Sequence, residues 1–241
     1  MGKPRLLVAL DFDGTLAPLA PRPELARLPE ATRAALRALA ARADVVVAVV
    51  SGRGLRDLQT KVGLARVAYA GNHGFELAVD GWRWTHPGVP ARRAALARAL
   101  ADATSLCRLA HGAWVEDKGP TFTVHVRAVR DRAGEAALRA GLSAALRRIG
   151  GLRLVPGKRV YEVRPRVDWD KGRAVELLRR LLAPRAACVY VGDDVTDEDA
   201  FRRLAGKALT VTVGHGPSAA SHRVGSLAAV RRLLDALLRG Y

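Results

Sequence analysis

Short apolar runs and helical periods alternate through the first and last parts of the chain. Three apolar runs end abruptly in polar sequence that contains glycine, as buried parallel strands do: 6–10, 45–50 and 188–191. Helical periods lie near them at 28–42, 172–182 and 198–205, and a final apolar run lies at 209–213. Strands that alternate with helices predict βαβ units. We therefore expect an α/β fold with a doubly wound parallel sheet.

The middle of the chain has a different rhythm, in which helices at 92–109 and 135–149 are each followed by two strands. One of these strands, 121–127, alternates polar residues with apolar ones, so it is expected to be half buried in an antiparallel sheet. This pattern predicts an inserted α+β cap domain. The expected domains are 1–83 (first part of the core), 84–166 (cap) and 167–241 (second part of the core).

The chain is strongly basic. Lys and Arg total 40 against 23 acidic residues, for a net charge of +17, which raises the question of an anionic partner. Aromatic residues are only 5%, however, and the arginines are spread over nearly every helical segment. A nucleic-acid site gathers basic and aromatic side chains on one surface. We interpret the charge as a dispersed, solvated surface and expect no nucleic-acid partner.

Cysteine spacing and hydropathy indicate the cellular compartment in which the protein is expected. Neither Cys107 nor Cys188 has the paired spacing of a zinc or redox motif, which suits a reducing environment. The residues before Asp11 lack the length of a secretion signal, and no apolar run approaches the roughly 18 residues of a membrane helix. We expect a cytoplasmic monomer with no membrane partner.

Two carboxylates directly follow the first predicted strand. In an open α/β sheet, ligands bind outside the carboxyl ends of the strands. Asp11 and Asp13 are two residues apart on extended chain, so their side chains project to the same side. Like charges at this separation require a proton or a cation between them. Because oxygen ligands suit Mg²⁺, we expect Mg²⁺ as the cofactor.

The other two strand ends also carry polar groups. Ser51, with Gly52 and Arg53, offers a hydroxyl and backbone amides to phosphate oxygens. Asp193 and Asp194 follow the third strand directly, where we favour metal binding over helix capping. For the polar and acidic residues at 196–199, which include Asp197, capping and function stay equally open.

Lys171 precedes the helix predicted at 172–182, where its charge opposes the positive end of the helix dipole. This unfavourable position suggests that Lys171 neutralises a bound phosphate. Together the strand ends predict a phosphoryl-transfer site. Asp11 is the expected nucleophile, which forms an aspartyl-phosphate, and Asp13 is the expected general acid and base. Ser51, Lys171 and Mg²⁺ would hold the phosphoryl group and offset its charge.

The motifs that carry these groups resemble those of the haloacid dehalogenase superfamily of phosphatases. They are Asp11-Phe12-Asp13-Gly14-Thr15, Ser51-Gly52-Arg53, Lys171-Gly172 and Gly192-Asp193-Asp194. Three further segments are similar to trehalose-6-phosphate phosphatases: Gly-Asn-His-Gly-Phe-Glu at 71–76, Val-Glu-Asp-Lys at 115–118 and Gly-Asp-Asp-Val-Thr-Asp-Glu-Asp-Ala-Phe at 192–201. The resemblance covers essentially the whole chain. It implies hydrolysis of a small-molecule substrate, trehalose 6-phosphate, to trehalose and phosphate.

The residues and the resemblance together predict three sets of site residues. The catalytic set is Asp11, Asp13, Ser51 and Lys171. The substrate-binding set is Gly52, Arg53, Asn72, His73, Glu116, Lys118, His125, Arg127, Glu162 and Arg164. The metal-binding set is Asp11, Asp13, Asp193, Asp194 and Asp197. The cap residues form pairs two apart on predicted strands, so each pair shares a face, which is also what a plain solvated sheet face would show.

Two other functions stay open. A phosphatase of the same fold could act on another sugar phosphate, such as sucrose phosphate or a glycosyl-3-phosphoglycerate. A basic nucleic-acid-binding protein could instead use an inactive phosphatase scaffold, although the intact set of Asp11, Asp13, Lys171 and Asp193 argues against such decay.

Overall fold

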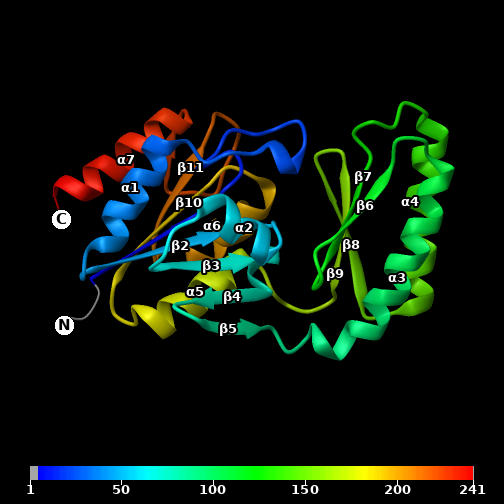
Figure 1. The fold of residues 1–241 in the computed structure, drawn as a ribbon, viewed down its shortest axis with the longest axis horizontal. Coiled ribbons are helices and arrows are strands. Elements are labelled where there is room, and N and C mark those ends of the chain that lie inside the picture. Colours follow the sequence, from blue (N-terminus) through cyan, green and yellow to red (C-terminus); the bar gives the residue numbers. More distant parts are fainter. Residues whose placement is uncertain (1–4, 241) are drawn as a thin grey trace. The chain divides into compact units, whose positions relative to one another are not determined.

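The computed structural model describes residues 5–240. Contacts within the chain divide it into two compact units. Unit 1 comprises Met1–Trp84 and Trp169–Tyr241, and unit 2 comprises Thr85–Asp168. The chain therefore leaves unit 1, forms unit 2 and returns (Figure 1).

Unit 1 contains an eight-stranded sheet in the order β12-β11-β10-β1-β2-β3-β4-β5 (Figure 1). Its strands are β1 (Leu6–Leu10), β2 (Val45–Val50), β3 (Val67–Gly71), β4 (Glu76–Val79), β5 (Trp82–Thr85), β10 (Ala187–Gly192), β11 (Leu209–Val213) and β12 (His222–Val224). Neighbours from β12 to β3 pair in parallel, whereas β4 pairs with β3 in the antiparallel sense. The predicted parallel sheet is confirmed.

Helices cover both faces of this sheet. They are α1 (Glu30–Ala41), α2 (Leu55–Val62), α5 (Lys171–Leu182), α6 (Val195–Leu204) and α7 (Leu227–Arg239), with 3-10 turns η1 (Pro23–Leu25) and η2 (Asn72–Gly74). Along β1, Leu6, Val8 and Leu10 pack into the cluster that contains α1 and α7. Leu7 and Ala9 pack into the cluster that contains α5 and α6. Burial on both faces explains the unbroken apolar runs and confirms the doubly wound fold.

Unit 2 contains a four-stranded antiparallel sheet in the order β6-β7-β9-β8. Its elements are β6 (Trp114–Asp117), β7 (Phe122–His125), β8 (Leu152–Gly157), β9 (Val160–Pro165), α3 (Arg93–Leu106), α4 (Arg132–Ile149), η3 (Pro90–Arg92) and η4 (Cys107–Leu109). Phe122 and Val124 of β7 pack against Leu138 and Leu142 of α4 in a separate hydrophobic core. The predicted antiparallel sheet, with one face on the helices, is confirmed.

Some predicted bounds are wrong. The strand expected at 121–127 ends at His125, so Arg127 lies in an exposed turn and does not share a strand face with His125. The helix expected at 198–205 begins at Val195, because Asp194 is its N-cap and forms a capping box with Asp197. Strands β3, β4, β5 and β12 and helices α2 and α7 were not predicted.

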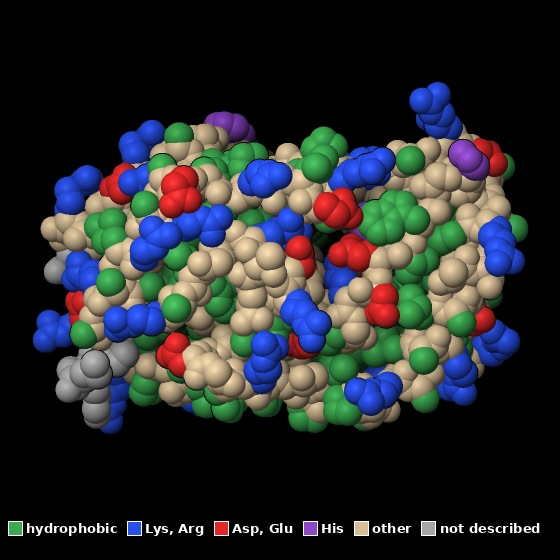
Figure 2. Space-filling view, in the orientation of Figure 1, with side chains coloured by type: hydrophobic (Ala, Val, Ile, Leu, Met, Phe, Trp, Pro, Cys, Tyr) green, Lys and Arg blue, Asp and Glu red, His purple; other side chains and the backbone are tan. Residues whose placement is uncertain are grey.

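Charged side chains are mixed over the surface. Figure 2 shows Lys and Arg distributed over the visible face with acidic and apolar side chains between them. Many arginines pair locally, as Arg42 does with Asp44 at 2.9 Å and Arg231 with Asp235 at 2.8 Å. In residues 5–240, no helix is long and apolar enough to cross a membrane.

Candidate active site

Asp11 and Lys171 meet at the carboxyl end of β1. Asp11 directly follows this strand, and its amide donates to the Val191 carbonyl of β10 at 2.8 Å. Lys171 is the first residue of α5, and its Nζ donates to Asp11 Oδ1 at 2.7 Å and to Asp197 Oδ1 at 2.8 Å. Both Asp11 and Lys171 are only 3% exposed. These carboxylates offset the unfavourable position of Lys171 at the start of a helix.

Asp11, Asp193 and Asp197 form an acidic cluster in which one carboxylate oxygen from each lies within 4.8 Å of the others. Asp193 lies against the turn that follows Asp11. Thr15 Oγ1 donates to Asp193 Oδ1 at 3.3 Å, and a Cβ at Gly14 would lie 2.1 Å from Asp193 Oδ2. Gly14 also has φ of +82°, a conformation that side chains disfavour. Glycine is therefore needed here for Asp193 to approach.

Asp197 is buried and accepts hydrogen bonds at both oxygens. Its Oδ1 accepts from Lys171 and from Tyr190 Oη, the latter at 2.5 Å. Its Oδ2 accepts from the amides of Asp193 at 3.1 Å and Asp194 at 3.0 Å. The Asp197 carboxylate therefore fixes both the Lys171 ammonium and the backbone of Asp193. For the residues at 196–199, the structure shows capping and site placement combined in Asp197.

Electrostatics set the state of these buried groups. Burial raises the pKa of the Asp11 carboxyl well above its ordinary value, Lys171 lowers it, and the Asp197 and Asp193 carboxylates raise it again. Burial lowers the pKa of Lys171, but Asp11 and Asp197 outweigh burial and raise it overall. The ammonium stays charged. Further positive charge in the cluster would favour the ionised form of Asp11.

This donor set fits Mg²⁺. All three members of the cluster offer carboxylate oxygens, the ligands that Mg²⁺ prefers, and they are close enough to share one ion. Asp194 lies beside the cluster as the N-cap of α6 and is not a member of it. The carboxylate oxygens of Asp13 accept hydrogen bonds from Arg53 and are not part of this cluster.

Arg53 holds Asp13. Arg53 Nε donates to Asp13 Oδ2 at 2.6 Å and Nη2 donates to Oδ1 at 2.7 Å, which makes a bidentate pair. Arg53 Nη1 also donates to Asp57 at 2.7 Å, and its guanidinium lies 5.3 Å from the centroid of the Phe12 ring. The Arg53 side chain is 9% exposed and that of Asp13 is 31% exposed. Asp13 is thus the accessible member of a fixed pair.

Ser51 directly follows β2 and contacts the η2 turn that follows β3. Its Oγ accepts from the Arg53 amide at 3.2 Å, and its carbonyl accepts from the His73 amide at 2.8 Å. The Asn72 amide donates to the Arg53 carbonyl at 2.7 Å. Asn72 and His73 are buried with positive φ of 51° and 57°, and a Cβ at Gly52 would lie 2.6 Å from the His73 ring. Strained backbone of this kind is often kept where it positions a site.

The polar face of the unit 2 sheet brings together most of the predicted cap residues. His125 Nε2 lies 2.8 Å from Glu116 Oε2. Arg164 Nη2 donates to Glu162 Oε2 at 2.5 Å, and Lys118 Nζ lies 4.0 Å from Glu162 Oε1. Glu162 and Arg164 are each 7% exposed, although they carry charge. These residues therefore form two groups of polar contacts, His125 with Glu116 and Glu162 with Arg164 and Lys118, in place of a plain solvated face. Arg127 lies outside the strands.

Three residues that contact these groups were missed from the sequence. Thr15 is part of the first motif, but its hydrogen bond to Asp193 was not predicted. Tyr190 is a phenol inside an apolar strand run, and a buried hydroxyl requires a partner. Trp114 stacks on His125 with a centroid separation of 4.0 Å, and it stands two residues before Glu116. The last two positions could have been found from these sequence signals.

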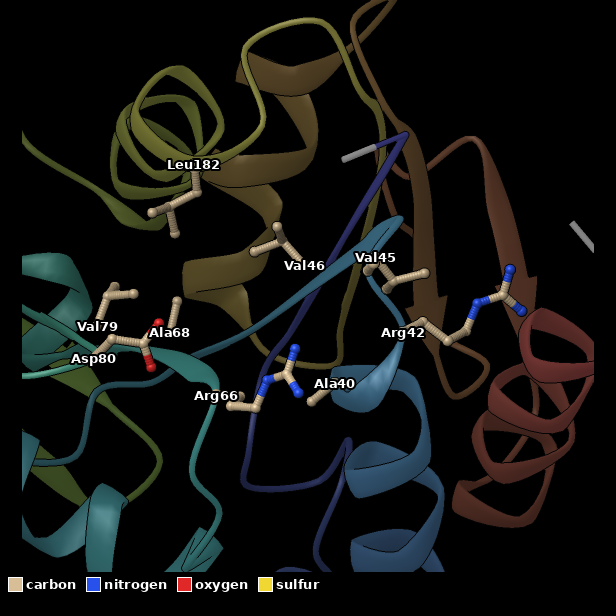
Figure 3. Close-up of a pocket in the computed structure, with 10 residues that line it drawn as sticks. Ala40, Arg42, Val45, Val46, Arg66, Ala68, Val79, Asp80 and Leu182 are labelled. Carbon is tan, nitrogen blue, oxygen red and sulfur yellow. The ribbon is translucent and has the colours of Figure 1, made fainter. Parts of the chain in front are cut away.

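A hollow of about 310 Å³ lies away from this chemistry. It is lined at the amino-terminal ends of the parallel strands by residues that include Val45, Arg66 and Leu182 (Figure 3). None of the predicted site residues lines it. The candidate active site is instead the acidic cluster at the opposite edge of the sheet.

Comparison with known proteins gives the family. The family model of trehalose-phosphatase matches residues 9–229. The chain is 40% identical over 221 residues to the trehalose-phosphate phosphatase of Mycobacterium marinum, covering 88% of this chain and 55% of that protein. It is 42% identical over 208 residues to that of Mycobacterium avium, covering 83% and 51%. The chain thus spans about half the length of these curated relatives.

Solved structures agree on the fold. A trehalose-6-phosphate phosphatase related protein superposes with a TM-score of 0.83 and 25% identity, covering 96% of each chain. The C-terminal domain of Candida albicans trehalose-6-phosphate phosphatase superposes with a TM-score of 0.80 at 21% identity, covering 98% of this chain and 92% of that one. A haloacid dehalogenase-like hydrolase from Bacteroides thetaiotaomicron shares the fold with a TM-score of 0.66 at 13% identity, covering 98% of this chain and 100% of that one. With the matched sequence motifs, these findings show that the chain belongs to the trehalose-phosphatase family, which has the haloacid dehalogenase fold.

Proposed function

We propose that the chain is a Mg²⁺-dependent phosphatase that hydrolyses trehalose 6-phosphate to trehalose and phosphate. The observation that carries this proposal is the buried contact of 2.7 Å between Lys171 Nζ and Asp11 Oδ1 inside an acidic cluster. This contact supports a site in which the proposed nucleophile, a positive charge and a cation lie together. The names of the curated relatives support trehalose 6-phosphate as the substrate.

The reaction has two displacements at phosphorus. In the first, an Asp11 carboxylate oxygen attacks, the aspartyl-phosphate bond forms, and the bond from phosphorus to the sugar oxygen breaks. The departing oxygen takes a proton from the Asp13 carboxyl group, which completes trehalose. In the second, Asp13 takes a proton from water as the water oxygen attacks phosphorus, and phosphate leaves the regenerated Asp11. Lys171 and Ser51 offset charge on the phosphoryl oxygens.

Asp13 must be released before it can carry a proton. Both of its carboxylate oxygens accept hydrogen bonds from Arg53 in the structure. Phosphate oxygens are equally good bidentate acceptors for a guanidinium. We propose that a bound phosphoryl group draws Arg53 away from Asp13, so that substrate binding frees the acid.

Asp11 and Asp193 would hold Mg²⁺ together with the Asp13 backbone carbonyl, and Asp197 remains a predicted contributor. Asp194 is the N-cap of α6, lies outside the acidic cluster and is not proposed as a ligand. When bound, Mg²⁺ polarises a phosphoryl oxygen and balances the carboxylate charge. Asp197 also keeps Lys171 in place, as its hydrogen bond of 2.8 Å indicates.

Unit 2 is proposed to act as the cap that recognises the sugar. Glu116, Lys118, His125, Glu162 and Arg164 offer donors and acceptors for hydroxyl groups on one sheet face. Arg127 and the loop residues Asn72 and His73 are proposed to contribute as well. We also propose that the protein acts as a cytoplasmic monomer without a nucleic-acid partner, and both cysteines are free, as a reducing compartment requires.

Phosphate release from a panel of esters tests the function. The panel contains trehalose 6-phosphate, sucrose phosphate, a glycosyl-3-phosphoglycerate and an aryl phosphate, each with Mg²⁺ and with EDTA. We expect the highest kcat/KM for trehalose 6-phosphate, loss of turnover with EDTA and recovery with added Mg²⁺. A higher kcat/KM for another sugar phosphate would replace the substrate and keep the chemistry. Turnover that persists in EDTA would contradict the cofactor.

A further inference from the structure

Trp114 and His125 form an aromatic stack on the polar face of the unit 2 sheet. They are direct cross-strand partners on β6 and β7. Their ring centroids are 4.0 Å apart and their planes differ by 4°, so one face of the indole is covered by the imidazole. The stack holds the indole in a fixed orientation.

The other face of the indole is open. Trp114 is 41% exposed, although one of its faces lies on His125. β6 is the edge strand of its sheet in the described part of the chain. By contrast, Trp84 and Trp169 pack on each other at 5.5 Å and lie against the core of unit 1. An exposed, oriented indole on a polar sheet face is therefore available for a ligand.

Polar groups border this open indole. Glu116 is two residues from Trp114 on β6, so both side chains project from the same face. Glu116 Oε2 lies 2.8 Å from His125 Nε2, which places a carboxylate beside the stack. Lys118 lies just beyond the end of the same strand. The surface is flat and apolar at its centre and carries hydrogen-bonding groups at its rim.

A pyranose ring has the complementary chemistry. One face of the ring presents C–H groups, whereas the hydroxyls project from its rim. We infer that Trp114 is a stacking platform for a pyranose ring of the sugar phosphate, which lies on the indole face opposite His125, with Glu116 near the ring hydroxyls. This inference rests on the proposed function and extends it, because it assigns affinity for the carbohydrate to a residue that takes no part in the phosphoryl chemistry.

The variants Trp114→Ala and Trp114→Phe test the platform, with Trp82→Ala as a matched control. Trp82 is 45% exposed but lies on β5 in unit 1. Kinetics are measured with trehalose 6-phosphate and with acetyl phosphate, which has no ring. Covering about 55 Å² of apolar surface corresponds to about 1.4 kcal/mol, or tenfold in affinity. We therefore expect Trp114→Ala to raise KM for trehalose 6-phosphate about tenfold, with kcat and acetyl phosphate turnover unchanged.

The remaining variants separate stacking from structural support. Trp114→Phe retains a smaller ring and is expected to give an intermediate KM, and Trp82→Ala is expected to match the wild type. Trehalose should change the tryptophan fluorescence of the wild type, and this change should be absent in Trp114→Phe. An unchanged KM in both Trp114 variants would overturn the inference, as would equal losses on the two substrates. If Trp114→Ala does not fold, the inference is tested by the KM and the fluorescence change of Trp114→Phe alone. A wild type inactive on every sugar phosphate would instead refute the proposed function.

Discussion

At the scale of single residues, burial decides what the charges at the end of β1 can do. Asp11, Lys171 and Asp197 are each at most 3% exposed, and charges removed from water are stable only when paired. Lys171 donates to Asp11 and Asp197, two of the three carboxylates in the acidic cluster. The excess of negative charge is a physical reason for a cation at this point, independent of any likeness to other proteins.

Asp11→Asn should abolish turnover and keep the fold. An amide of the same size cannot form the aspartyl-phosphate, so we expect activity to fall about 1000-fold or more. Lys171 keeps its hydrogen bond to Asp197, and a buried carboxyl group whose charged form burial disfavours is replaced by a neutral amide. Thermal unfolding without metal should therefore occur at the wild-type temperature or above it. Phosphate release and calorimetry check both points, and activity near that of the wild type would exclude Asp11 as the nucleophile.

Tyr190→Phe should impair the site through Lys171. Burial and the neighbouring Asp197 raise the pKa of the Tyr190 phenol, so it stays protonated and donates to the oxygen that also accepts from Lys171. Loss of a hydrogen bond to a carboxylate is expected to lower the free energy of unfolding by about 2 kcal/mol. We also expect a lower kcat, because Lys171 is no longer held between two fixed partners.

Tyr69→Phe is the matched control. Tyr69 is buried in the same sheet, and its hydroxyl donates to the Leu64 carbonyl at 2.6 Å, which is a neutral acceptor. Its removal should cost about 1 kcal/mol and leave kcat unchanged. Urea unfolding and steady-state kinetics compare the two variants. Equal effects on kcat would show that Tyr190 supports the fold only.

At the scale of elements, the site is formed by the carboxyl ends of strands and the first turns of helices. β1 and β10 end side by side because they pair in parallel, from Leu6 with Ala187 to Leu10 with Val191. Helices α5 and α6 begin at the same edge and bring Lys171 and Asp197 to Asp11. The first turn of α6 thus contributes both to helix stability and to the site.

Asp194→Ala should act on helix α6 more than on the metal. Asp194 is the N-cap of α6, whereas the acidic cluster consists of Asp11, Asp193 and Asp197. We expect a loss of about 1 kcal/mol in the free energy of unfolding. The Mg²⁺ concentration for half-maximal activity should not change.

Asp131→Ala provides the comparison in unit 2. Asp131 caps α4 and accepts from the amides of Ala133 at 2.9 Å and Gly134 at 3.0 Å, far in the sequence from any metal-binding motif. It should cost a similar amount of stability. A Mg²⁺ requirement that rises in Asp194→Ala and not in Asp131→Ala would show that Asp194 is a metal ligand.

At the scale of the whole molecule, the described residues form three buried hydrophobic clusters, two in unit 1 and one in unit 2. Each unit has its own buried clusters. The basic residues are spread over the visible surface and interrupted by carboxylates (Figure 2). A net charge of +17 provides long-range attraction, and the face in Figure 2 shows no continuous basic stripe that could act as a fixed binding surface.

This distribution predicts weak, non-specific binding to nucleic acid at most. Fluorescence anisotropy with labelled single-stranded DNA and RNA, at about 0.15 M salt, should show no saturable binding at low micromolar protein, because screening removes dispersed attractions. Any binding at low salt should disappear as salt is added. Saturable binding at physiological salt, together with no turnover of phosphate esters, would favour the scaffold alternative.

Local sequence patterns were enough to predict the α/β order, the antiparallel middle segment and the convergence of Asp11, Lys171 and Asp193. These follow from local periodicity and from a general property of parallel sheets, whose strands all end at one edge. Other elements were missed, among them α7, although its 13 residues carry a helical period, and several short strands. β4 has only 4 residues and β12 only 3, which is too short for a period to show.

The contacts between individual side chains, by contrast, depend on how the elements pack against one another. The tertiary structure paired Arg53 with Asp13, joined Tyr190 to Lys171 through Asp197, and stacked Trp114 on His125. Hydrogen bonds and ring contacts depend on distances set to a few tenths of an ångström by the packing of both partners. Lys171 and Asp11 are separated by 160 positions in the sequence, and a local pattern cannot show that two such distant residues form a hydrogen bond.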